Sequence, residues 1–185
     1  MTTVATPPTA PADVPSRPSP WRYAVLALIV LFAAFWIWAL FFASKESING
    51  IGEDGWTDRA QAVCEAANAE REDLADFREV DGDDRAMLTE RAAIVDQATD
   101  ILERMLDDVV AVQPAGDKGA ELVPRWEADY RTYLADRRTF GDDLRAGNND
   151  PFAETVVDAI PISDKIARFA ADNHMPACVP PTDLG

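Results

Sequence analysis

The sequence predicts an all-α protein with one transmembrane helix followed by an up-down, four-helix bundle-like domain. Residues 23–43 form an apolar run without a single charged side chain. The rest of the chain contains four segments in which apolar residues recur every three or four positions, the period of an amphipathic helix. We therefore expect four regions, which are a proline-rich cytoplasmic tail (1–20), a membrane helix (21–43), a linker (44–55) and an acidic extracytoplasmic domain (56–185).

The apolar run is long enough to cross a bilayer. At a rise of 1.5 Å per residue it spans roughly 30 Å, the thickness of the hydrocarbon core. A cleaved signal peptide is the alternative, but signal peptides have shorter apolar cores that end in small residues. The run here ends in Phe41, Phe42 and Ala43, which favours an uncleaved anchor.

Basic residues predict the orientation of this anchor. Arg17 and Arg22 precede it, whereas Lys45 alone follows it and is succeeded by acidic residues. Because basic residues stay on the cytoplasmic side, we expect the N-terminus inside the cell. Six prolines in residues 1–20 predict a disordered tail, and the polar, glycine-containing residues 44–55 predict a linker.

Four amphipathic segments make up the predicted domain, at residues 57–79, 85–112, 122–145 and 152–173. The third has the clearest apolar stripe, and the fourth is interrupted at Ile160-Pro161-Ile162. Short connections predict antiparallel neighbours. The opposite face of the second segment is acidic and is interpreted as a solvated surface; its residues are Asp96, Asp100, Glu103 and Asp107.

The chain contains two cysteines, Cys64 and Cys178, and both follow the membrane segment. An even number of cysteines in an exported domain is typical of a disulfide, and the up-down topology returns Cys178 to the vicinity of Cys64. Two unrelated free thiols are the alternative.

A single charge interrupts the apolar stripe of each of the first three segments. These charges are Glu70, Arg91 and Arg137, and counting residues from the distal end of the bundle puts them at similar heights, with Asp158 at that height on the fourth segment. Three interpretations remain open, namely a buried ionic layer, an anion pocket with arginine as a bidentate clamp, and long side chains that reach solvent.

Composition and motifs exclude several classes of function. The net charge is −16, which disfavours binding to nucleic acid. The single histidine, His174, follows the last helix, where a cation complements the helix dipole; a metal ligand or general base is the alternative. We find no motif for an enzyme, a metal site or a cofactor, so we expect none of these.

Three segments resemble uncharacterised actinobacterial single-pass membrane proteins: residues 56–67, residues 120–138 and the stretch from 151 to 184 that contains Met-Pro-Ala-Cys. This resemblance implies an architecture but no activity. We expect a non-enzymatic extracytoplasmic domain that contacts other proteins or the cell envelope. A small-ligand sensor that acts through a membrane partner is the alternative, and the sequence leaves the oligomeric state open.

Overall fold

The computed structural model describes residues 20–42, 47–74 and 84–184, and it divides the chain into two compact units, residues 1–45 and 46–185. Helix α1 (Pro20–Phe41) belongs to the first unit, and none of its side chains is buried. Its 22 residues correspond to about 33 Å of helix. This helix is long and apolar enough to cross a membrane. The predicted disordered tail, except for Pro20, lies outside the described residues.

Residues 47–53, which lie within the predicted linker (44–55), pack against the folded domain. Ile51 is buried, and its amide donates a hydrogen bond to the side chain of Asn173 at 2.8 Å. The side-chain amide of Asn49 donates a hydrogen bond to the Asp172 carboxylate at 2.8 Å. Hydrogen bonds from Ser47 and Asn49 hold the pKa of Asp172 below its usual value. The polar residues of this segment are therefore bonded to the domain.

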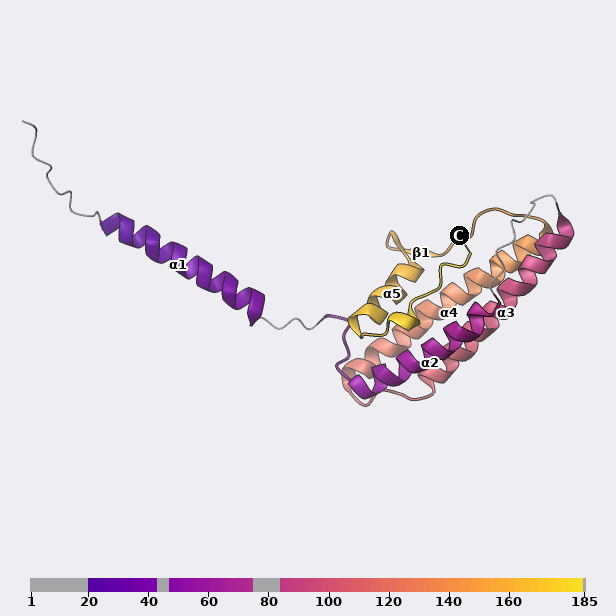
Figure 1. Ribbon diagram of the computed structural model, residues 1–185, viewed down its shortest axis with the longest axis horizontal. Coiled ribbons are helices and arrows are strands. Elements are labelled where there is room, and N and C mark those ends of the chain that lie inside the picture. The colour runs from indigo at the N-terminus through magenta and orange to yellow at the C-terminus, as the bar shows by residue number, and fades with distance from the viewer. Residues whose placement is uncertain (1–19, 43–46, 75–83, 185) are drawn as a thin grey trace, which may run out of the picture. The chain divides into compact units, whose positions relative to one another are not determined.

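Three long helices form the body of the domain and run antiparallel, side by side (Figure 1): α2 (Asp54–Glu72), α3 (Arg85–Val110) and α4 (Asp117–Ala146). Local signals set their ends. The Asp84 carboxylate accepts hydrogen bonds from two amides in the first turn of α3, as an N-cap residue does. Gly147 ends α4 with a φ of 89°, a conformation that glycine adopts without steric cost.

Helix α4 begins five residues before the predicted start at Leu122, so Pro124 lies beyond its first turn. The carboxylate of Glu53 accepts hydrogen bonds from the amides of Ala115 and Gly116 at 2.7 and 2.8 Å, which satisfies donors at the start of the helix. Pro124 leaves the carbonyl of Ala120 without its helical donor, but both residues are exposed and water can bind there.

The fourth predicted helix is wrong over its first half. Residues 148–155 have no regular secondary structure, strands β1 (Val156–Val157) and β2 (Ile160–Pro161) form a short antiparallel hairpin, and only α5 (Ile162–Asp172) is helical. Pro161 explains the boundary, since proline lacks an amide donor and disfavours helical conformation in the residue before it. Asp158 and Ala159 turn the hairpin with positive φ values of 53° and 62°.

A C-terminal tail, residues 173–184, occupies the space that the missing half of the fourth helix would have filled. It leaves α5, passes through the short 3-10 helix η1 (Pro176–Cys178) against α2, and ends with Leu184 buried among residues of α3 and α4. The domain has two apolar clusters. The larger joins α2, α5 and the facing halves of α3 and α4, and the smaller contains Leu88, Val95, Phe140, Leu144 and Leu184.

A disulfide between Cys64 and Cys178 fastens this tail to the middle of α2, with the two Cα atoms 5.2 Å apart, as predicted. Both cysteines are fully buried in the larger cluster. The bond closes a loop with a sequence separation of 114 residues. The chain-entropy model gives up to about 4.8 kcal/mol for a loop of that length, whereas about 2–4 kcal/mol is typical.

We expect the double substitution Cys64→Ser with Cys178→Ser to lower the free energy of unfolding by about 2–4 kcal/mol, because the unfolded chain regains the freedom that the bond removes. Urea unfolding of the full chain in detergent measures this. Adding reductant should lower the midpoint of the parent protein and leave that of the double variant unchanged. Equal midpoints for the parent with and without reductant would contradict the prediction.

Candidate functional site

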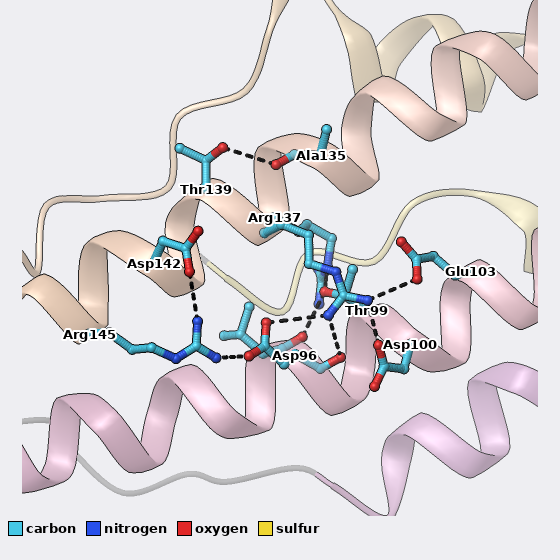
Figure 2. A network of polar contacts seen from close by, with 11 residues as sticks. Asp96, Thr99, Asp100, Glu103, Ala135, Arg137, Thr139, Asp142 and Arg145 are labelled. Atoms are coloured by element: carbon cyan, nitrogen blue, oxygen red, sulfur yellow. Dashed lines mark hydrogen bonds and ion pairs between the residues drawn. The ribbon is translucent and has the colours of Figure 1, made fainter.

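Arg137 is the one charged residue among the buried residues of the described chain, and its side chain is 0% exposed. It lies on α4 between Leu134, which belongs to the larger apolar cluster, and Phe140, which belongs to the smaller one. Thr99 on α3 is also buried and contacts it (Figure 2). A charge in such a place is costly unless it is paired and hydrogen-bonded.

Each guanidinium nitrogen of Arg137 donates a hydrogen bond. Nε donates to the Thr99 hydroxyl at 3.1 Å, and Nη1 donates to the Tyr133 hydroxyl at 3.3 Å. Nη1 and Nη2 bind the two carboxylate oxygens of Asp183 at 2.6 and 3.2 Å, the bidentate arrangement that makes arginine–carboxylate pairs strong. Arg71 on α2 also contacts Asp183, at 3.2 Å. We call these five residues the arginine node.

The surroundings of Asp183 and Arg137 favour the charged form of both side chains. Burial by itself raises the pKa of Asp183, but hydrogen bonds from Arg137 and the positive charges of Arg137 and Arg71 outweigh it, so the pKa lies below its usual value. Burial lowers the pKa of Arg137, and the Asp183 carboxylate more than offsets this. Both side chains are therefore charged at neutral pH, and the tail is fixed to α4 by an ion pair.

The predicted charged layer does not form. Glu70 is exposed and pairs with Arg104 at 2.7 Å, both side chains being 58% exposed. Arg91 is half-buried on α3, and Asp158 is exposed in the turn of the hairpin. Of the four candidates only Arg137 is buried. Its clamp is filled by Asp183 of the same chain, so the predicted anion pocket is occupied internally.

The sequence analysis did not predict Asp183 as the partner of Arg137, because it compared only charged residues on the predicted helices by their height along the bundle. One signal was present in the sequence. Asp183 is the first acidic residue after Cys178, and the predicted disulfide fixes Cys178 against α2. A residue five positions beyond a fixed point can reach about 17 Å along an extended chain. The tail was therefore within reach of the domain interior.

The acidic face of α3 is also not simply solvated. Arg138 of α4 contacts Asp96, Asp100 and Glu103. Arg145 contacts Asp96 and Asp142 (Figure 2). Asp107 pairs with Arg131 at 3.0 Å. Because these side chains are partly exposed, each pair contributes at most about 1 kcal/mol, and their main effect is to fix the register of α3 against α4.

A groove of about 300 Å³ lies between α5 and the tail. Its apolar lining includes Tyr133 and Phe152, one side is formed by Ser163, Asp164 and Ala167 of α5, and the other by residues 179–182 and Leu184. The Glu154 carboxylate, at the edge, accepts hydrogen bonds from the amide and the hydroxyl of Ser163, both at 2.8 Å. The disulfide holds one end of the segment that forms this wall, and the arginine node holds the other.

Metal binding finds no support in the described part of the chain, which contains no group of three or more histidine, cysteine, aspartate or glutamate side chains placed to hold an ion. His174 is exposed, follows the C-cap residue of α5 and has a φ of 58°. No family model, curated protein or solved structure matches the chain. Function must therefore be inferred from the node and the groove.

The ion pair of the node yields the first prediction from this site. We expect Asp183→Asn to lower the free energy of unfolding by about 3 kcal/mol, because it leaves the buried Arg137 charge without its counterion. This value is at the lower end of the range for a buried pair, since the Asp183 side chain is 26% exposed. Glu70→Gln, in an exposed pair, is the control and should change the free energy of unfolding by no more than about 0.5 kcal/mol.

The pH dependence gives this prediction a second measurement. A carboxylate whose pKa is lower in the folded than in the unfolded state stabilises the fold above its unfolded pKa of about 3.9, and this contribution is lost as the pH falls through the folded pKa. The parent should therefore exceed Asp183→Asn in stability at pH 7 and lose that advantage below pH ~4. Equal urea midpoints for Asp183→Asn and Glu70→Gln at pH 7 would contradict the role of the ion pair.

Tyr130 and Tyr133 provide a second, matched prediction. The Tyr133 hydroxyl donates to the carbonyl of Pro181 at 2.9 Å and accepts from Arg137, whereas the Tyr130 hydroxyl is buried and has no hydrogen-bond partner in the structure. Burial accordingly raises the pKa of Tyr130. We expect Tyr133→Phe to cost about 1–3 kcal/mol and Tyr130→Phe to cost nothing or to stabilise. Thermal unfolding of the two variants should separate them, and a larger loss for Tyr130→Phe would overturn the assignment.

Proposed function

We propose that this chain is a single-pass membrane protein whose folded domain binds a protein partner on the extracytoplasmic side of the membrane and has no enzymatic activity. The anchor is α1. Arg17 precedes it and Arg22 lies in its first turn, and this supports a cytoplasmic N-terminus. The Cys64–Cys178 disulfide supports the location of the domain, because such bonds persist in oxidising compartments and are rare in the cytosol.

The groove is the observation that carries the binding role. Its apolar lining is left uncovered, although the chain fixes both ends of the tail that forms its wall. Binding sites that are held in shape before a partner arrives lose less entropy on binding. A domain stabilised around such a groove, and tethered to a membrane helix, is suited to hold a partner near the membrane.

A small-molecule sensor is the second candidate, and the size of the groove favours it. Pockets for small ligands have volumes of roughly 300–1,000 Å³. The volume here, about 300 Å³, lies at the lower limit of that range. Such a sensor would transmit its signal through a membrane partner.

One labelling experiment tests both topology and partner binding. Ala167→Cys places a thiol in the groove, and Asp108→Cys places one on α3, away from it. A membrane-impermeant, thiol-reactive photo-cross-linker should label both variants in intact cells if the domain is outside. Illumination should then give a discrete, heavier adduct for Ala167→Cys alone. Labelling only after permeabilisation would overturn the topology, and identical adducts for both variants, or none, would overturn the binding role.

A further inference from the structure

Both charged side chains that line the groove are hydrogen-bond acceptors. Glu154 and Asp164 are carboxylates, which accept but do not donate when ionised. Pro180 and Pro181, in the opposite wall, have no amide hydrogen. The other polar side chains of the lining are the hydroxyls of Tyr133, Ser163 and Thr182. An occupant that supplies donors can pair with the two carboxylates.

Two of the three hydroxyl groups in the lining are already bonded internally, and the third belongs to the exposed Thr182. The Ser163 hydroxyl and amide donate to Glu154, and the Tyr133 hydroxyl donates to the carbonyl of Pro181. Each oxygen of Glu154 keeps a second lone pair, and Asp164 is exposed. Acceptor capacity is therefore left over, while the hydroxyl donors of Ser163 and Tyr133 are used.

Charge points to the same kind of occupant. Two acidic residues and no basic residue line the groove, and the whole chain carries a net charge of −16. Such a potential attracts cations and repels anions. The lining also has apolar surface, of which Phe152 is half-buried and Val179 is 37% exposed. An occupant with an aliphatic stem and a cationic, donor-rich head matches both parts.

Resting on the proposed partner-binding role, we propose that the groove binds an arginine side chain presented by an extended segment of the partner protein. The guanidinium carries five donors in a planar fork that fits carboxylates, and it stacks on aromatic rings. Glu154 and Asp164 receive the head, and Phe152 and Val179 cover the stem. Lysine binds more weakly, since its compact ammonium holds its water more strongly.

The test uses the full chain in phosphatidylcholine nanodiscs and a fluorescein-labelled peptide, Gly-Ser-Leu-Arg-Leu-Ser-Gly, followed by fluorescence anisotropy. We expect saturable binding that weakens about tenfold when glutamine replaces the peptide arginine or when the protein carries Asp164→Asn, the loss for one charge-assisted hydrogen bond. Ala167→Trp fills the groove and should abolish binding. Asp108→Asn removes an exposed charge from α3 and should leave the affinity within twofold of the parent.

Failure has distinct forms. No saturable binding by the parent, equal affinities for the arginine and glutamine peptides, or an equal loss in Asp108→Asn and Asp164→Asn would each overturn the arginine site. Thermal unfolding checks that the variants are folded; if Ala167→Trp is not, Asp164→Asn decides. A groove-specific cross-link in cells without peptide binding would leave the partner-binding role standing and reject the arginine. Absence of both would reject the two proposals together.

Discussion

The bidentate pair between Arg137 and Asp183 is the interaction on which the domain depends. It lies where the two apolar clusters meet, and it joins α4 to a tail that no helix or sheet hydrogen bond holds in place at that point. Arg71 of α2 contacts the same carboxylate, and Thr99 of α3 accepts a hydrogen bond from the Arg137 guanidinium. The ion pair thus connects the tail to all three long helices.

The path of the tail explains how the core of the domain is filled although its fourth helix, α5, is short. Helix α5 packs against α4, and Leu184 of the tail is buried beside Phe140 and Leu144 in the second half of α4. Two restraints act on the tail, the disulfide at Cys178 and the ion pair at Asp183. Between them Pro180 is buried, the carbonyl of Pro181 accepts a hydrogen bond from Tyr133, and the groove lies beside these residues.

Periodicity predicted the parts of this fold that depend on local sequence. The stripe of Trp126, Tyr130, Tyr133, Phe140 and Leu144 is buried as expected, and the charge that interrupts it, Arg137, is buried too, an arrangement that the sequence analysis left open. The fourth helix failed at Pro161, whose effect on the preceding residues is stronger than their apolar pattern. The partner of Arg137 could not be predicted from helix heights, because it comes from a segment without periodicity. The pairing of the α3 acids with the α4 arginines likewise depends on the rotation of two helices, which composition does not specify.

The sequence separation of the tail contacts has a consequence for how the domain folds. α2, α3 and α4 are neighbours along the chain, whereas Asp183 meets Arg137 and Arg71 across 46 and 112 residues, and the disulfide spans 114. Contacts between distant residues form slowly, because closing a long loop costs entropy before any contact is gained. We therefore expect the helices to associate first, with the Arg137 guanidinium still hydrated, and the tail to dock last. Interactions that form after the transition state act mainly on the unfolding rate, so the tail governs how long the folded domain persists rather than how fast it is reached.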